Sequence, residues 1–253
     1  MITKKDQSNI RVCAFIPARG GSKRIPRKNI VDFVGKPLIL HTIEAARQSG
    51  IFKTVIVSTE DSEIKEVCQH YCDIHDRKPE LAHDQATLKD VCLDFLTTHP
   101  EYDVLCLLEA DCPLRTAEDL KASWQAFLHS GRSMLMSVFN YGTCYPFWAL
   151  SDKDEVGNTK EGYQFFFSKK YLTKSQNLPP VYCPSGAFKW IDTQSFVQAR
   201  TLYPDDLGVY VLEWHQALDI DTINDLLIGK MIKIFLQDHP HFFDHERTKI
   251  RTS

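Results

Sequence analysis

The fold is decided by one stretch near the start of the chain, Val12-Cys-Ala-Phe-Ile-Pro-Ala-Arg-Gly-Gly-Ser-Lys-Arg-Ile-Pro-Arg-Lys-Asn-Ile-Val-Asp-Phe-Val-Gly-Lys-Pro37. The apolar run from Val12 to Ile16 ends at Pro17 and a pair of glycines, which predicts a short buried strand followed by a loop. Adjacent glycines let backbone N–H groups point into one concavity, and such a nest binds anions. The loop also carries cations at Arg19, Lys23, Arg24, Arg27 and Lys28. These features predict a triphosphate site.

The alternative for a Gly-Gly-Ser-Lys loop is a basic surface turn. Its position directly after a buried strand favours a ligand site, because open α/β sheets bind ligands at the carboxyl ends of their strands. The loop has neither the Gly-x-x-x-x-Gly-Lys-Ser/Thr pattern of P-loop proteins nor the Gly-x-Gly-x-x-Gly pattern of dinucleotide binders. Both of those interpretations are therefore set aside.

Length and charge narrow the functional class. A chain of 253 residues has the length of one α/β domain with a modest insertion, so we expect residues 1–253 to form a single domain. A formal net charge of -3 argues against a general nucleic-acid binder, so the cations of the first loop predict a small anionic partner. The first eleven residues are polar and charged, and no apolar run reaches membrane length. We therefore expect no membrane partner and a cytoplasmic location.

Cysteine spacing supports the same location. The eight cysteines form no Cys-x-x-Cys pair and no zinc-ligand spacing. Several lie in apolar runs, among them Cys13 and Cys106, where a buried free thiol is the usual state.

Beyond the first loop, short apolar runs alternate with segments of helical periodicity. We expect strands at 54–58, 104–108, 134–138 and 208–214, a strand just before residue 77, helices at 37–50, 61–71, 84–98 and 116–130, and a last helix that ends near residue 236. Gly50 stops the first helix, and Thr116-Ala-Glu-Asp is a capping box. The alternation predicts an α/β fold with a mostly parallel sheet flanked by helices.

Residues 139–182 break this alternation, because aromatic residues are frequent there and Gly and Pro interrupt the pattern. We interpret this segment as an inserted arm. An exposed hairpin without a partner would have fewer aromatic residues.

The first loop carries a family resemblance. Ile16-Pro-Ala-Arg-Gly-Gly-Ser-Lys-Arg-Ile-Pro-Arg-Lys-Asn29, followed by Gly35-Lys-Pro-Leu-Ile39, resembles the signature loop of the cytidylyltransferases that make CMP-sialic acids. It is most similar to the bacterial enzymes for pseudaminic and legionaminic acid. The resemblance implies a Rossmann-like nucleotidyltransferase fold and a homodimer, in which the arm at 139–182 carries the dimer contacts and closes the partner's sugar site.

The resemblance also implies a CTP site. Arg19 and Lys23 would hold the β- and γ-phosphates and act in catalysis, and Asn29 and Arg77 would recognise the cytidine. Residues 77–84 match the family's Arg-x-x-Glu-Leu-Ala-x-Asp segment, although a solvated loop is the alternative for this connector. Thr87 falls where the family has a hydroxyl residue near the base or ribose. The full set of predicted CTP contacts is Ala18, Arg19, Gly20, Gly21, Ser22, Lys23, Asn29, Arg77, Thr87 and Asp111.

Three aspartates form the predicted metal site. Asp219 and Asp221 are two positions apart, so on extended backbone they share one face, and paired carboxylates attract a divalent cation. Taken alone, Asp-Ile-Asp-Thr also fits a helix cap with one solvated carboxylate. The resemblance to the family's metal motif favours a site for Mg²⁺ or Mn²⁺ on Asp219 and on Asp221, which would act in catalysis. Asp111, which follows a predicted strand, is the third expected ligand.

The predicted sugar site departs from the family in one respect. Where sialate enzymes carry Gln-Pro-Thr-Ser-Pro-Leu-Arg, with the glutamine on the sugar acid, this chain has Glu109-Ala-Asp-Cys-Pro-Leu-Arg115. A carboxylate near an acidic substrate is unfavourable unless a metal or an arginine intervenes. Ser185-Gly186 resembles the turn that lets the family's backbone approach the sugar. The sugar's carboxylate needs a cation, and Lys189 and Arg115 are the alternatives.

The expected reaction is transfer of CMP from CTP to a nine-carbon 2-keto-3-deoxy sugar acid, such as pseudaminic, legionaminic or N-acetylneuraminic acid, with release of pyrophosphate. One alternative acceptor is the eight-carbon acid of lipopolysaccharide, although Asn29 favours the nine-carbon group. A second alternative is a catalytically silent nucleotide-binding protein, which an intact loop and both late aspartates disfavour.

Overall fold

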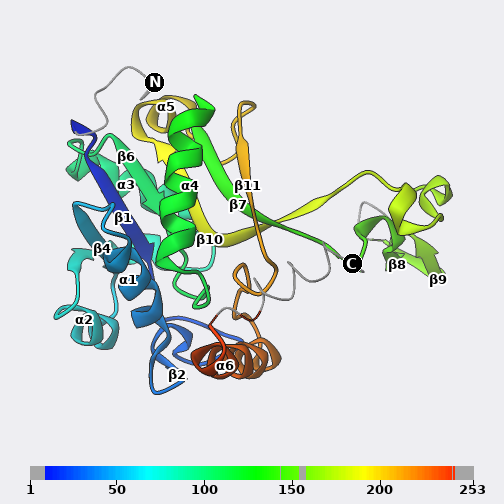
Figure 1. Cartoon of the computed structure of the whole chain (residues 1–253), viewed down its shortest axis with the longest axis horizontal. Helices are drawn as coiled ribbons and strands as arrows, with labels where there is room; N and C mark the ends of the chain where they lie inside the picture. The colour runs from blue at the N-terminus through cyan, green and yellow to red at the C-terminus, as the bar shows by residue number, and fades with distance from the viewer. Residues whose placement is uncertain (1–8, 143, 154–157, 241, 243–253) are drawn as a thin grey trace.

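A computed structural model describes residues 9–142, 144–153, 158–240 and 242. Its central sheet has the strand order β11-β7-β10-β6-β1-β4-β5 (Figure 1). The strands are β1 (Val12–Pro17), β4 (Thr54–Thr59), β5 (Asp73–Asp76), β6 (Val104–Leu107), β7 (Met134–Asn140), β10 (Tyr182–Asp192) and β11 (Gly208–Leu212). Only β10 runs antiparallel to its neighbours, β6 and β7. The predicted mostly parallel α/β sheet is confirmed.

The main strand missed by the sequence analysis is β10. Sequence analysis gave only a turn at Ser185-Gly186, whereas the structure has a strand whose register on β7 shifts between Pro184 and Lys189. The proline and the glycine interrupt the alternating pattern on which strand prediction depends, and such interruptions are typical of a β-bulge.

The side chains of β1 divide between the two faces of the sheet. Ala14 and Ile16 pack with residues of α1 (Leu38–Ser49), α2 (Ser62–Cys68) and α4 (Ala117–Ser130). Cys13 and Phe15 pack on the other face with α3 (Leu88–Thr98) and α5 (Thr193–Ala199). Both faces are therefore covered by helices, as a buried parallel sheet requires, and Figure 1 shows α1 and α4 in front of the sheet.

Local signals account for most helix boundaries. The capping box at Thr116 is confirmed, and Gly50 ends α1 in the left-handed region with φ of 67°. Two helices are shorter than expected: α2 ends at Cys68, and α3 begins only after Thr87, which is its N-cap. The last helix, α6 (Ile223–Asp238), also starts at a capping box, formed by Thr222 and Asp225. None of the described helices is long and apolar enough to cross a membrane.

The segment between β7 and β10 projects from the body of the molecule (Figure 1). It contains an antiparallel pair, β8 (Leu150–Lys153) and β9 (Thr159–Phe165). Large apolar side chains are exposed on it, among them Tyr163 and Phe166. The hairpin of β2 (Asp32–Phe33) and β3 (Lys36–Pro37) packs through Phe33 against α6. The cysteines, including the buried Cys13 and Cys106, are free thiols, as predicted.

Candidate active site

A cavity of about 490 Å³ opens where the loops after β1, β5 and β6 meet. Most of the predicted loop, base and metal residues line it. They are Arg19, Ser22, Lys23, Asn29, Arg77, Asp111 and Asp221, and they are joined by Glu109 of the predicted sugar site and by Arg24, Lys28 and Asp84. The structure therefore brings together segments that are widely separated in the sequence.

The cations of the first loop pair with carboxylates from other parts of the chain. Arg19 and Lys23 both contact Asp84, the first at 2.9 Å, and Arg24 contacts Asp221 at 2.7 Å. These contacts turn the basic groups toward the cavity, where phosphate oxygens could take the place of the carboxylates. Arg19 and Lys23 thus both lie at the cavity, and their role in phosphate binding stays a prediction.

The predicted nest of backbone amides is not formed. The Gly20 N–H donates to Glu60 Oε1 at 2.8 Å, and the Ser22 N–H donates to the Gly20 carbonyl at 3.0 Å. The neighbouring Ala18 is buried, and its N–H donates to the carbonyl of Ser58. Because these three amides are hydrogen-bonded within the protein, the predicted anion binding would depend on the side-chain cations of the loop.

Arg27 has a structural role. Its guanidinium binds Asp61 through two hydrogen bonds of 2.5 and 2.7 Å, and these lower the pKa of Asp61 to about 2. Asp61 also caps α2 by accepting from the N–H of Ile64. The bridge passes so close to Gly20 that a Cβ there would lie 2.2 Å from Asp61 Oδ2. Gly20 is thus required for packing against this ion pair.

Gly20→Ala should lower the free energy of unfolding by about 1–3 kcal/mol, because the added methyl must displace a carboxylate held by two hydrogen bonds and a helix cap. Gly21→Ala is the matched control, since a Cβ at Gly21 meets nothing within 4 Å. Chemical denaturation of both variants measures the difference. Equal stability of the two would contradict this account of Gly20.

Arg77 is held at the ends of β4 and β5. Its side chain is buried and donates to the Ser58 carbonyl at 2.6 Å and to the Ser58 hydroxyl at 3.3 Å. The hydroxyl of Ser58 lies 3.0 Å from Nδ1 of His75. Burial lowers the pKa of His75, so the neutral ring can accept from Ser58 while Ser58 accepts from Arg77. Sequence analysis missed both supporting residues, because an isolated Ser or His carries no pattern.

Asn29 and Thr87 make local contacts in this structure. The Asn29 amide donates to the Arg19 carbonyl at 2.9 Å, which ties the end of the loop to its beginning. Thr87 forms the capping box of α3 with Asp90, and it is not among the residues that line the cavity, although its neighbours Ala86 and Leu88 are.

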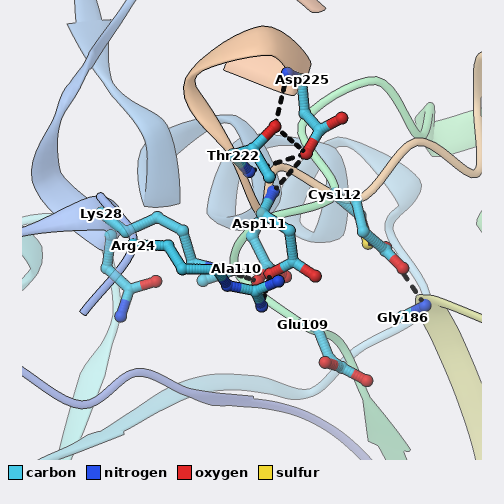
Figure 2. A network of polar contacts seen from close by, with 12 residues as sticks. Arg24, Lys28, Glu109, Ala110, Asp111, Cys112, Gly186, Thr222 and Asp225 are labelled. Atoms are coloured by element: carbon cyan, nitrogen blue, oxygen red, sulfur yellow. Dashed lines mark hydrogen bonds and ion pairs between the residues drawn. The ribbon is translucent and has the colours of Figure 1, made fainter. Parts of the chain in front are cut away.

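Carboxylates from two segments gather on one side of the cavity. Asp111, Cys112 and Asp219 offer ligand atoms within 4.8 Å of one another. Figure 2 shows Lys28 and Arg24 on one side of Asp111 and Cys112 on the other. Lys28 Nζ lies 2.6 Å from Asp111 Oδ2 and 3.1 Å from Asp221 Oδ1.

Asp219 and Asp221 have different partners in the structure, although their spacing predicted a shared face. Residues 219–221 are not in a strand. Asp219 accepts from the thiol of Cys112 and from the Gly186 N–H, whereas Asp221 contacts Lys28 and Arg24. Asp111 connects the two, because it lies in the group with Asp219 and shares Lys28 with Asp221.

The electrostatics of this cluster suit a cation. Burial, reinforced by the charge of Asp111, raises the pKa of Asp219. Burial together with Asp111 raises the pKa of Glu109 to about 7. For Asp221 the hydrogen bond and charge of Lys28, with help from Arg24, outweigh burial and lower the pKa. The oxygen donors fit a hard divalent ion such as Mg²⁺ or Mn²⁺, since such an ion stabilises crowded carboxylates.

The predicted sugar side contains a buried lysine. Lys189 Nζ lies 3.8 Å from Glu109 Oε1, so the acid that departs from the family pattern has a cation beside it. A Cβ at Gly186 would lie 2.7 Å from Cδ of Glu109, so the missing side chain makes room for Glu109. Ser185 is buried, and its hydroxyl donates to Ser137 at 2.9 Å.

Arg115 is buried, and its guanidinium is hydrogen-bonded within the protein core. Its guanidinium donates to the carbonyls of Glu109, Gly186 and Ala187 and to the Thr42 hydroxyl. It therefore clamps the segment after β6 to β10. Of the two cations considered for the sugar's carboxylate, Lys189 is the one that lies beside the cavity-lining Glu109, and its role stays a prediction.

Sequence analysis omitted several residues of this site. Lys28 and Arg24 were recognised as loop cations, but their aspartate partners could not be assigned from the sequence. Cys112 had no zinc-ligand spacing to mark it, and Glu60 had no motif.

Comparisons with known proteins identify the family. A family model described as Cytidylyltransferase matches residues 13–173. The pseudaminic acid cytidylyltransferase of Campylobacter jejuni is 34% identical over 226 residues, covering 86% of this chain and 94% of the relative. The CMP-N,N'-diacetyllegionaminic acid synthase of Legionella pneumophila is 30% identical, covering 89% of this chain and 97% of the relative.

Solved structures support the fold. CMP:2-keto-3-deoxy-manno-octonic acid synthetase, solved with CTP, is similar with a TM-score of 0.65 and 17% sequence identity, covering 88% of this chain and 98% of that chain. The predicted nucleotidyltransferase fold is thereby confirmed. The chain belongs to the cytidylyltransferase family.

Proposed function

We propose that this protein transfers CMP from CTP to the anomeric hydroxyl of a nine-carbon 2-keto-3-deoxy sugar acid and releases pyrophosphate. The observation that carries the proposal is that the cationic loop and two of the three predicted metal aspartates, Asp111 and Asp221, line one cavity. The names of the relatives, pseudaminic acid cytidylyltransferase and CMP-N,N'-diacetyllegionaminic acid synthase, support this class of acceptor. An eight-carbon acceptor has weaker support, because the likeness to the octonic acid synthetase concerns the fold alone.

The chain's cations would neutralise the departing pyrophosphate. Arg19 and Lys23 already turn toward the cavity, and their partner Asp84 is largely exposed. Because phosphoryl transfer depends on positioning and on charge neutralisation, these two residues contribute by holding the β- and γ-phosphates in line with the attacking hydroxyl. Arg77, fixed by Ser58, would hold the cytosine.

Asp111, Asp219 and Asp221 would hold Mg²⁺ or Mn²⁺. When bound there, the ion would neutralise charge on the α-phosphate and lower the pKa of the attacking hydroxyl. On the acceptor side, Lys189 would bind the sugar's carboxylate, and Glu109 would accept a hydrogen bond from a hydroxyl or N–H group.

Pyrophosphate release with CTP and, separately, N-acetylneuraminic, legionaminic and pseudaminic acid tests the proposal. We expect release with one nine-carbon acid and its loss in Asp221→Ala. Binding of CTP without release for any of the three would contradict the acceptor class and favour another acid or a silent nucleotide-binding protein.

Ser58→Ala should raise the KM for CTP about tenfold and leave kcat within about twofold, because it loosens Arg77 without removing it and so weakens binding of the ground state and the transition state equally. Steady-state kinetics with CTP as the varied substrate measure both constants. Ser58→Thr, which keeps the hydroxyl, should restore the KM; failure of this rescue would mean that the hydroxyl does not position Arg77.

We also propose that the arm joins two copies of the chain. Exposed large apolar side chains cluster on it: Leu150, Tyr163, Phe165, Phe166, Phe167 and Leu172. A patch of this kind is typical of a protein interface. Sedimentation equilibrium should give a dimer for the full chain and a shift toward monomer for Tyr163→Asp/Phe166→Asp. A wild-type monomer at micromolar concentration would contradict the dimer.

A further inference from the structure

Lys28 occupies the space between two carboxylates assigned above to the metal. Figure 2 shows Lys28 beside Asp111. Its ammonium group contacts Asp111 at 2.6 Å and Asp221 at 3.1 Å, and its side chain is only 15% exposed. The backbone around it is anchored, because Arg27 is held by Asp61 and Asn29 by the Arg19 carbonyl. The backbone position of Lys28 is therefore set by the fold, and its ammonium group is mostly buried between the two carboxylates.

This contact conflicts with binding of a divalent ion. A cation that binds both Asp111 and Asp221 must share their oxygens with Lys28, and two cations a few ångströms apart repel strongly in a partly buried site. The ammonium group of Lys28 must then pair with another anion, because a desolvated charge without a partner costs several kcal/mol of free energy. Lys28 also lines the cavity proposed to take the triphosphate, so phosphate oxygens are within the reach of its flexible side chain.

We propose that Lys28 is an internal counter-ion that neutralises Asp111 and Asp221 in the nucleotide-free protein and exchanges them for a phosphate oxygen when CTP and the metal bind. The inference rests on the proposed function of the site. It makes metal binding weak until the nucleotide supplies a new partner for Lys28. Since coupling between two ligands is reciprocal, the metal favours CTP binding to the same extent.

The test measures Mn²⁺ binding to the full-length protein in the absence of nucleotide, by electron paramagnetic resonance of the free ion. Lys28→Met should bind Mn²⁺ more tightly than the wild type, on the order of tenfold. Lys23→Met is the matched control, because it removes a loop cation that contacts Asp84 and neither metal carboxylate. Its Mn²⁺ affinity should equal that of the wild type.

Thermal unfolding gives a second readout. In EDTA, Lys28→Met should melt below the wild type, because Asp111 and Asp221 lose their shared counter-ion, and Mn²⁺ should raise the Tm of the variant more than that of the wild type. If Lys28→Met does not fold, Lys28→Gln, which keeps much of the length and polarity, takes its place in both measurements.

Equal Mn²⁺ affinity in the wild type, Lys28→Met and Lys23→Met would overturn the exchange, as would the absence of Mn²⁺ binding in every variant. These measurements need neither a sugar acid nor turnover. If Lys28→Met binds Mn²⁺ more tightly than the wild type but the wild type releases no pyrophosphate, only the proposed reaction is contradicted. If the wild type releases pyrophosphate but Lys28→Met and the wild type bind Mn²⁺ equally, only this inference is contradicted.

Discussion

Asp111→Asn should lower kcat for pyrophosphate release about a thousandfold, with little change in fold. Asp111 belongs to the three-residue ligand group and also contacts Lys28, so it is common to both halves of the carboxylate cluster. The amide keeps the shape of the side chain but loses the charge that a divalent ion requires, and metal stabilisation of such a reaction is worth several kcal/mol. Steady-state kinetics at saturating CTP and acceptor measure the effect.

Asp32→Asn is the matched control for this variant. Asp32 is an exposed aspartate that also pairs with a lysine, Lys230, but it lies on the β2–β3 hairpin outside the cavity lining. It should keep full kcat. If Asp111→Asn keeps more than about a tenth of wild-type kcat, the carboxylate of Asp111 is not part of the catalytic site.

Arg115→Met should lower the free energy of unfolding by about 3 kcal/mol or more, because it leaves the Glu109, Gly186 and Ala187 carbonyls without the donor that now binds them in the core. For a chain of this size such a loss lowers the Tm by roughly 6–12 °C. Differential scanning calorimetry measures the Tm.

Lys189→Met separates the two cations considered for the sugar's carboxylate. It should raise the KM for the acceptor by about tenfold or more, because a charged hydrogen bond is lost. The structural role of Arg115 would be contradicted if Arg115→Met kept the wild-type Tm and raised the acceptor KM instead.

The fold was largely predictable because its signals are local. The buried run of β1, the stop at Gly50 and the capping box at Thr116 each depend on neighbouring residues, and the structure confirms all three. The strand β10 was not predictable, because Pro184 and Gly186 interrupt its pattern and the bulge they accompany is stabilised by pairing with β7 and β6.

Part of the lining of the cavity was predictable, but the partners of its charged side chains were not. In the sequence, Arg27 and Lys28 are equivalent members of one basic loop. In the structure, Arg27 supports α2 by binding its N-cap, Asp61. Lys28 instead contacts Asp111 and Asp221, which follow it in the chain by 83 and 193 positions. Arg115 is similar, since its burial depends on carbonyls of β10. Such pairings follow from the tertiary fold, which motif spacing does not reveal.

Mass spectrometry of the product made from CTP and a nine-carbon 2-keto-3-deoxy sugar acid tests the central claim most directly. The account predicts a conjugate with the mass of the acid plus CMP minus water, formed in equal amount to pyrophosphate and absent with Asp221→Ala. Pyrophosphate accompanied only by free CMP, or a conjugate that retains the β-phosphate, would contradict it.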